Sequence, residues 1–256
     1  MYPVLFHIGS FPISSFGLMV GLAFLAGGWL SARSFEKLGH RGGIAWDLLT
    51  WCVLGGFLGA KLWWFAEELA RNPGTSASTL LTVEGLRGGL TWYGGFIGGT
   101  IGGLVASRRY GVSLLDTLNA GAPALAASHA IGRIGCFLVG DDYGRPSDVP
   151  WAVAFPKGTP PTSERVHPTM LYETFWLIPV FAWLWYRRGR SPFLFGEWLV
   201  LSGIGRLWIE EFRINPPALG PFSNAQVVAL ACIVLGSASW LWFAARAAPV
   251  SSPAAK

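Results

Sequence analysis

The feature that most constrains this chain is a series of seven apolar segments, each close to the length of a membrane-spanning helix. About 20 predominantly apolar residues are needed to cross the hydrocarbon core of a bilayer. Of the 256 residues, 52% are hydrophobic and 13% are charged, whereas a soluble domain usually carries about 25% charge. We therefore predict an all-α integral membrane protein with seven transmembrane helices, at 14–31, 45–66, 89–107, 113–131, 170–186, 196–212 and 223–245.

Basic residues are concentrated in alternate connections between these segments. More than half of the 19 Lys and Arg residues follow the first, third, fifth and seventh segments, namely Arg33, Lys37, Arg41, Arg108, Arg109, Arg187, Arg188, Arg190, Arg246 and Lys256. Cytoplasmic connections carry such an excess, so we predict that the N-terminus lies outside and the C-terminus lies in the cytoplasm. The same excess, together with attraction to anionic lipid, explains the net charge of +5 without a nucleic-acid partner. The N-terminus lacks the basic start of a cleavable signal peptide, so the first segment is predicted to be retained.

The connections indicate one transmembrane domain over residues 1–246 and no separate soluble domain. The outward connection at 133–169 is rich in Pro and Gly and is predicted to form a small outward-facing head. Within it, residues 151–155 are expected to form either a short strand or an interfacial segment. The small and polar residues 247–256 are predicted to form a disordered cytoplasmic tail.

Two of the segments share a glycine-rich pattern. Residues 55–60, Gly-Gly-Phe-Leu-Gly-Ala, resemble residues 94–99, Gly-Gly-Phe-Ile-Gly-Gly. Small residues spaced by four allow helix backbones to approach closely. We expect these glycines to pack helices together rather than to cradle a phosphate, because they lie inside spanning segments.

A polar stretch between Gly132 and Glu173 lies at the predicted outer boundary of the membrane. Charged groups there are costly unless they are solvated or paired, so such a cluster is a candidate functional site. We take Arg133 as the end of the fourth segment, with His129 one turn earlier on the same helical face. Arg133 either binds a phosphate through its planar donors or extends to lipid headgroups.

The sixth segment carries a second polar set, because Arg206, Glu210 and Arg213 are spaced by four and three residues and therefore share one face. Arg206 lies within the predicted membrane and needs a partner, which Glu210 one turn later can provide. The set is either a structural ion pair or part of a site for an anionic lipid headgroup.

Further polar residues lie at or inside the predicted spans. His167, Tyr172 and Glu173 open the fifth segment, where the helix dipole favours an acidic residue, so Glu173 is either structural or functional. Tyr93 and Lys61 lie within predicted spans. The simpler interpretations are that Tyr93 is an aromatic residue at the membrane interface and that the Lys61 amine extends towards the membrane surface. The three cysteines show no metal-binding spacing, and no metal or nucleotide cofactor is expected.

Ordered motifs along the chain carry a family resemblance. They are Phe-Gly-Leu-Met at 16–19, Gly-Gly-Leu-Thr-Trp-Tyr-Gly-Gly at 88–95, Gly-Arg-Ile-Gly-Cys-Phe at 132–137 with Gly140, Gly144 and Arg145, His-Pro-Thr-Met-Leu-Tyr-Glu at 167–173, and Arg206, Glu210, Glu211, Phe212, Arg213 and Gln226. Over nearly the whole chain these motifs resemble the prolipoprotein diacylglyceryl transferase family. The resemblance implies seven spans with the N-terminus outside, in the bacterial cytoplasmic (inner) membrane.

The resemblance also implies an enzymatic reaction. Members of this family transfer a diacylglyceryl group from phosphatidylglycerol to the lipobox cysteine of a pre-lipoprotein signal peptide and release glycerol 1-phosphate, the first step of bacterial lipoprotein maturation. Arg133 and Arg206 match positions that stabilise charge on the leaving phosphate. The other positions that the resemblance assigns to substrate binding are Phe16, Lys61, Cys136, Gly144, His167, Tyr172, Glu173, Glu210 and Arg213.

The chain departs from the usual family pattern at several positions. The departures are Tyr93 for His, Cys136 for Asn, Phe16 for Tyr, Lys61 for Arg and Met170 for Gln. The acceptor thiol attacks as a thiolate, and the change at Tyr93 removes the obvious proton acceptor. We hypothesise that His129 takes part of that role, because histidine titrates near neutral pH. Tyr93 and His129 therefore join Arg133 and Arg206 as candidate catalytic residues.

Two alternative functions stay open at this point. One is a divergent paralogue that uses another lipid donor or thiol acceptor. The other is a non-catalytic membrane protein that binds or transports lipid, against which Arg133, Arg206, Glu210 and His167 argue. A transporter would also show paired broken helices in repeated halves, and the short glycine repeat is a weak sign of that.

Overall fold

The computed structural model describes residues 2–9, 11–72, 82 and 89–246, so the predicted tail at 247–256 lies outside the described residues. The chain divides into two compact units. The first unit comprises Met1–Leu38 and Leu118–Lys256, and the second comprises Gly39–Thr117. The prediction of one transmembrane domain over residues 1–246 stays a prediction.

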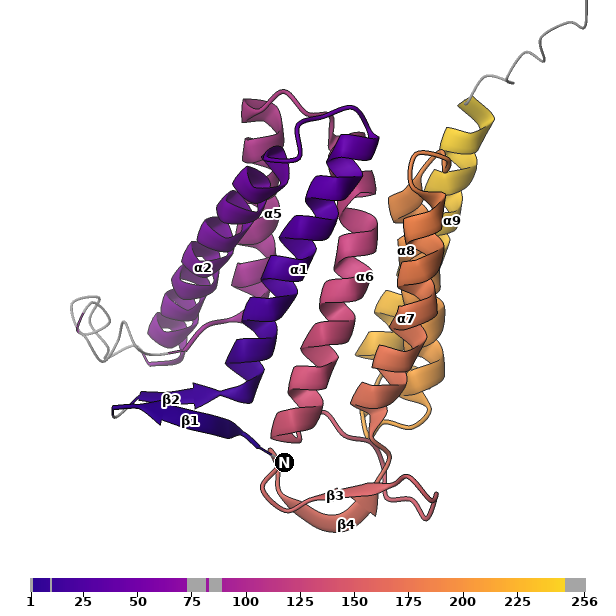
Figure 1. The fold of residues 1–256 in the computed structure, drawn as a ribbon. Coiled ribbons are helices and arrows are strands. Elements are labelled where there is room, and N and C mark those ends of the chain that lie inside the picture. The colour runs from indigo at the N-terminus through magenta and orange to yellow at the C-terminus, as the bar shows by residue number, and fades with distance from the viewer. Residues whose placement is uncertain (1, 10, 73–81, 83–88, 247–256) are drawn as a thin grey trace, which may run out of the picture. The chain divides into compact units, whose positions relative to one another are not determined.

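Helices make up most of both units (Figure 1). In the described part of the chain they are α1 (Ser15–Lys37), α2 (Ile44–Arg71), α5 (Trp92–Arg109), α6 (Leu114–Val139), α7 (Thr169–Arg187), α8 (Leu194–Glu210) and α9 (Asn224–Arg246). Each helix overlaps one of the seven predicted segments, so the helical fold class is confirmed. A serine marks the start of α1, because Ser14 Oγ accepts the Gly17 N–H at 3.0 Å in the usual manner of an N-cap.

Four helices of the described chain, α1, α2, α6 and α9, are long and apolar enough to cross a membrane. Their surfaces agree with this composition, since Val234 and Leu235 of α9 are 65% and 63% exposed. Extended apolar surface of this kind suits lipid better than water. The chain is therefore a helical membrane protein. Helices α5, α7 and α8 have 18, 19 and 17 residues, and their crossing of the membrane stays a prediction.

The prediction that Arg133 ends the fourth segment is wrong. Helix α6 continues to Val139, and Gly140 follows it with a positive φ of 73°, as is common just after a helix C-terminus. The helix continues because residues 134–139 are mostly apolar and because the charge of Arg133 is paired inside the fold. The connection to α7 therefore begins at residue 140 rather than at 133.

The connection between α6 and α7 is an ordered segment next to the ends of both helices (Figure 1). Strand β3 (Val153–Phe155) pairs antiparallel with β4 (Thr162–Val166), so the strand alternative for residues 151–155 is confirmed. The buried residues of this segment share one apolar cluster with α6 and α7, formed by Cys136, Phe155, Val166 and Met170. Packing therefore fixes the connection against the two helices.

Two further hairpins precede α1 and α9. Strand β1 (Val4–Ile8) pairs antiparallel with β2 (Phe11–Ser14), which leads into α1. Strand β5 (Pro217–Leu219) pairs in the same way with β6 (Phe222–Ser223), which leads into α9. Both hairpins therefore direct the chain into the start of a long apolar helix.

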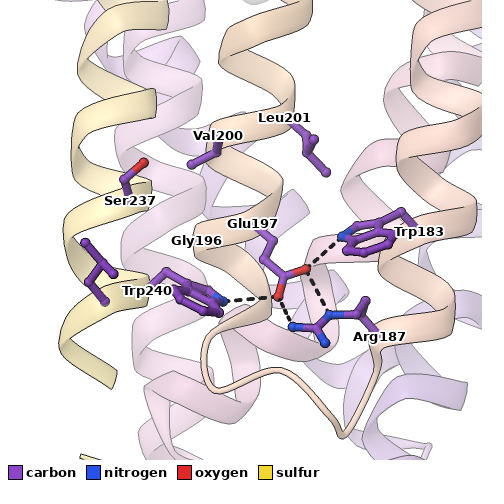
Figure 2. Close-up of a pocket in the computed structure, with 9 residues that line it drawn as sticks. Trp183, Arg187, Gly196, Glu197, Val200, Leu201, Ser237 and Trp240 are labelled. Carbon is purple, nitrogen blue, oxygen red and sulfur yellow. Dashed lines mark hydrogen bonds and ion pairs between the residues drawn. The ribbon is translucent and has the colours of Figure 1, made fainter. Parts of the chain in front are cut away.

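One carboxylate, that of Glu197 in α8, joins three helices near the C-terminal end of α7 (Figure 2). Trp183 and Arg187 of α7 each donate to it at 2.9 Å, and Trp240 of α9 donates at 3.1 Å. An apolar groove of about 460 Å³ lies beside these side chains. Because a carboxylate with several donors is stable in a partly buried position, Glu197 holds these ends of α7, α8 and α9 together.

In the second unit, α2 and α5 pack through the repeated glycines. A Cβ atom placed on Gly98 would lie 2.9 Å from Gly59 Cα and 3.0 Å from the Gly55 carbonyl carbon, and it would also meet the Gly55 carbonyl oxygen. Such contacts leave no space for a side chain, so the two backbones touch directly. The predicted packing role of the two glycine motifs is confirmed.

Replacement of Gly98 by alanine should destabilise this helix pair, because the new methyl group has no space between the backbones. We expect Gly98→Ala to cost about 1–3 kcal/mol, as overpacked interfaces do, and to lower the temperature of unfolding measured by Trp fluorescence in detergent. Gly95→Ala is the matched control, since its Cβ would lie 3.6 Å from Ala60 Cβ and 3.7 Å from Gly56 O. Equal stability of the two variants would contradict this account.

Candidate functional site

The candidate site starts on one face of α6, where His129 and Arg133 lie one turn apart, as predicted. The Arg133 side chain is largely buried, and half of the His129 side chain is exposed. A buried guanidinium needs anionic partners, because its desolvation is otherwise costly. The structure supplies two such partners, from α7 and from the connection after α6.

Glu173 of α7 is the first partner and lies at the centre of the site. Its Oε2 contacts Arg133 Nε and lies 3.6 Å from His129 Nε2. Its Oε1 accepts Arg206 Nη1 of α8 at 2.7 Å. One buried carboxylate, only 6% exposed, therefore connects α6, α7 and α8. Both interpretations of Glu173, structural and functional, are compatible with these contacts, and its role in the site stays a prediction.

Arg206 continues the site along α8. Its Nη2 pairs with Glu210 Oε2 at 3.0 Å, which confirms the partner predicted from the spacing of four. The other oxygen of Glu210 accepts Asn215 Nδ2 at 2.7 Å and Ser223 Oγ at 2.5 Å. Arg213 Nε lies 3.9 Å from Glu210 Oε2. Glu210 is therefore held from several sides and keeps Arg206 in position.

Asp142 is the second partner of Arg133 and the site residue that the sequence analysis missed. Its Oδ2 accepts Arg133 Nη1 at 2.9 Å, and its Oδ1 accepts Arg213 Nη2 at 2.7 Å. Partial burial raises the pKa of the Asp142 carboxyl, but the hydrogen bonds from the two arginines outweigh burial and the net pKa lies below its ordinary value. Asp142 is therefore ionised at neutral pH and bridges the two guanidinium groups.

These contacts form a single set, which we name the ion-pair network. Its members are His129, Arg133, Asp142, Glu173, Arg206, Glu210 and Arg213. Three guanidinium groups face three carboxylates, so the network is neutral when His129 is neutral. Beside it lies a cavity of about 30 Å³, which is space for about one water. The network thus offers convergent donors for an anion.

Some buried donors in the ion-pair network lack a hydrogen-bond partner among the described residues, among them atoms of Arg133 and Arg213. The buried Arg133 Nη2 has no hydrogen-bond partner within the described ranges. A buried donor that stays unpaired costs about 1–3 kcal/mol, and it is a typical position for a ligand or a water molecule. This atom is therefore available to a bound anion.

His167 and Tyr172 lie in a different cluster from the ion-pair network. His167 Nδ1 and Tyr172 Oη are 2.9 Å apart, and Trp151 Nε1 donates to the same Tyr172 oxygen at 2.7 Å. Burial lowers the pKa of His167, and the nearby Arg145 lowers it further, so this ring is neutral at neutral pH. The cluster borders an aromatic groove of about 440 Å³. The substrate-binding roles of His167 and Tyr172 stay predictions.

Gly144, Cys136 and Phe16 lie close to the site but are placed mainly by packing. A Cβ atom on Gly144 would meet the Phe212 carbonyl oxygen and would lie 2.8 Å from Thr169 Cγ2, so only glycine fits there. Cys136 Sγ accepts Arg133 Nη1 at 3.5 Å. Phe16 packs beside Gly135 of α6, where a Cβ atom would lie 3.3 Å from its ring. Their predicted contacts with substrate are not tested by this geometry.

Lys61 and Tyr93 belong to the second unit. Lys61 is buried, donates to Gly89 O at 3.4 Å, and lies 4.6 Å from the centre of the Trp64 ring. Tyr93 is largely exposed and packs edge-on against Trp92. These contacts account for the positions of both side chains within the second unit. The assignment of Tyr93 to catalysis and of Lys61 to substrate binding stays a prediction.

The arginines of the ion-pair network carry the donors that an anion requires, and the His129 imidazole lies beside them. Within the described ranges, no three His, Cys, Asp or Glu side chains are grouped as metal ligands.

The missed residue, Asp142, lies in the quoted motif between Gly140 and Gly144. Its side-by-side acidic pair with Asp141, directly after an arginine-bearing helix, is the signal that could have identified it.

Comparison with known proteins identifies the family of this chain. The family model described as prolipoprotein diacylglyceryl transferase matches residues 3–242. A relative from Gloeobacter violaceus is 31% identical over 98% of this chain and 96% of its own length. One from Trichormus variabilis is 34% identical over 98% of this chain and 94% of its own. One from Clostridium tetani is 30% identical over 92% of this chain and 95% of its own. All three are named phosphatidylglycerol–prolipoprotein diacylglyceryl transferase.

The family model covers nearly the whole chain, and the matched residues include every member of the ion-pair network. The relatives likewise align over almost their full length. The chain therefore belongs to the prolipoprotein diacylglyceryl transferase family.

Proposed function

We propose that this protein transfers the diacylglyceryl group of phosphatidylglycerol to the lipobox cysteine thiol of a pre-lipoprotein. The cysteine sulfur forms a bond to the glyceryl carbon, and the bond between that carbon and the phosphate oxygen breaks. The electron pair of the broken bond stays on the phosphate, which leaves as glycerol 1-phosphate. The observation that carries this proposal is the buried Arg133, which has an unpartnered Nη2 donor among the described residues.

Arg133 and Arg206 suit the leaving group of this reaction. Negative charge increases on the phosphate as the bond breaks, and donors that are fixed beforehand stabilise such charge best. Glu173 fixes both guanidinium groups, since it contacts Arg133 Nε and accepts Arg206 Nη1 at 2.7 Å. Glu210 restrains Arg206 from the other side at 3.0 Å. In this proposal the two carboxylates position the arginines, and the arginines bind the phosphate.

His129 is the proposed acceptor of the thiol proton. Half of its side chain is exposed, so an incoming thiol can reach the ring. Glu173 Oε2 lies 3.6 Å from His129 Nε2 and stabilises the imidazolium that forms on proton uptake. In enzymes with an activated nucleophile, a base takes the proton of the nucleophile and a third group orients the base. Here the substrate thiol, His129 and Glu173 would fill these three roles. The proton then passes to the leaving phosphate or to solvent.

The proposed topology has seven spans in the bacterial inner membrane, with the N-terminus outside and the C-terminus in the cytoplasm. An 18-residue helix such as α5 is about 27 Å long at ~1.5 Å per residue, which approaches the hydrocarbon thickness of about 30 Å. The β3–β4 connection then faces outward as a small head, and the ion-pair network lies at the outer boundary. This places the site on the side where a lipobox cysteine emerges.

Replacement of Arg133 by alanine should slow transfer strongly while the protein stays folded. Purified protein in phosphatidylglycerol vesicles is mixed with a synthetic lipobox peptide, and mass spectrometry of the peptide measures the diacylglyceryl increment. We expect the Arg133→Ala rate to fall about 100-fold or more, as for loss of one donor to a charged transition state.

Arg33→Ala is the matched control, because Arg33 forms an exposed pair with Glu36 and lies outside the network. It should transfer at the wild-type rate. If the wild-type protein adds no diacylglyceryl group from phosphatidylglycerol but does so from another phospholipid, the protein is a paralogue with another donor. If it modifies no peptide with any phospholipid, the non-catalytic lipid-binding function is favoured.

Replacement of His129 by alanine tests the proton acceptor through the pH dependence. Loss of a general base typically costs about 100-fold or more in rate. We expect such a loss for His129→Ala at pH 7, with partial recovery toward pH 9, because a free thiol with a pKa of about 8.5 then ionises without help. Initial rates from pH 6 to 9 measure this. A fully active His129→Ala enzyme at pH 7 would show that another group takes the proton.

A further inference from the structure

The ion-pair network already contains as many carboxylates as guanidinium groups. Arg133, Arg206 and Arg213 face Asp142, Glu173 and Glu210. A lipid phosphate adds at least one negative charge to this neutral set. Like charges in a partly buried site repel strongly. A phosphate therefore binds best if one carboxylate leaves the arginines as it arrives.

Asp142 is the carboxylate best able to leave. Its side chain is 48% exposed, whereas those of Glu173 and Glu210 are 6% and 3% exposed. Asp142 also lies in the connection after α6 rather than inside a helix. Movement of its side chain into solvent therefore needs no change in helix packing, whereas movement of either glutamate would leave a buried charge unpaired.

The backbone of Asp142 supports the same assignment. Its φ is 58°, in the left-handed region that is uncommon for residues other than glycine. Two contacts hold this conformation, since its carbonyl oxygen accepts Thr169 Oγ1 at 2.7 Å and Arg213 Nη1 at 3.1 Å. The main chain is thus fixed by bonds that do not involve the carboxylate, and the side chain can move independently.

The position of the carboxylate resembles that of a bound phosphate. Its two oxygens accept one hydrogen bond each from Arg133 Nη1 and Arg213 Nη2, at 2.9 and 2.7 Å. Arginine pairs present the same donor geometry to carboxylates and to phosphates. The carboxylate of Asp142 thus occupies a place between two arginines that suits a phosphate oxygen pair.

We propose that the Asp142 carboxylate occupies the position of the substrate phosphate between Arg133 and Arg213. The phosphate of the lipid donor displaces this carboxylate when it binds. This inference rests on the proposed function, since the phosphate is that of the lipid donor. The returning carboxylate then competes with glycerol 1-phosphate and promotes product release. Asp142 is thus a positioning residue that sets phosphate affinity, and it takes no part in bond making.

Binding of sn-glycerol 1-phosphate to the purified full-length protein, measured by isothermal titration calorimetry in nonionic detergent, tests this proposal. Asp142→Asn removes the charge, and asparagine tolerates the left-handed backbone. We expect it to bind the phosphate at least about tenfold more tightly, because a competing like charge is absent. Asp142→Gly is a second neutral variant that suits a positive φ, and it should tighten binding in the same way.

Two controls separate charge competition from structural effects. Asp142→Glu keeps the charge and should bind with about the wild-type affinity. Asp148→Asn makes the same chemical change in the same connection, at an exposed residue, and should leave binding unchanged. In the transfer assay, Asp142→Asn should lower KM for phosphatidylglycerol and increase inhibition by glycerol 1-phosphate. A purely structural role of Asp142 predicts the opposite, a higher KM and weaker inhibition.

Unchanged or weaker binding of glycerol 1-phosphate by both neutral variants overturns the proposal. The proposed function fails in a different manner, namely if the wild-type protein transfers no diacylglyceryl group. In that case tighter phosphate binding by Asp142→Asn still establishes the displaceable carboxylate. The calorimetric and mass-spectrometric results therefore distinguish the two failures.

Discussion

The buried carboxylate of Glu173 is the interaction on which the rest of this structure depends. A charge inside an apolar helix bundle is stable only with partners, because its desolvation otherwise costs several kcal/mol. Glu173 of α7 finds Arg133 on α6 and Arg206 on α8. The same contacts hold three helices together and direct two guanidinium groups to one place. The fold and the candidate site therefore depend on the same buried carboxylate, while Asp142 and Glu210 add a second contact to Arg133 and Arg206, respectively.

The network around Glu173 combines rigid and movable parts. Glu210 is restrained by Asn215 and Ser223, so Arg206 is held from a fixed point. Asp142, in contrast, is half exposed. Preorganised donors favour a developing charge, whereas a movable counterion keeps those donors paired until a ligand arrives. This division suits a site that must bind one phosphate and release another in each cycle.

Sequence patterns within single helices led to correct predictions. The spacing of four between Arg206 and Glu210 predicted their ion pair, and the spacing of glycines predicted the close packing of α2 on α5. The prediction was wrong where a charged residue was taken as the end of a helix. Helix α6 passes through Arg133 to Val139, because the arginine is neutralised by residues from elsewhere in the chain. A hydropathy profile along the sequence registers a charged residue, but it does not register the distant residue that neutralises the charge.

The sequence by itself determined the helices of the described residues, because apolar length and helical periodicity are local properties, and its ordered motifs indicated the family and the residue types of the site. Only the tertiary structure decided which charges meet. Arg206 pairs with a glutamate 33 residues away, and Arg213 with an aspartate 71 residues away. The same packing brings His167 and Tyr172 into contact with each other, whereas Glu173, next to Tyr172 in the motif, contacts Arg133 and Arg206. Contacts between helices depend on how the helices pack, and no spacing within one segment encodes that.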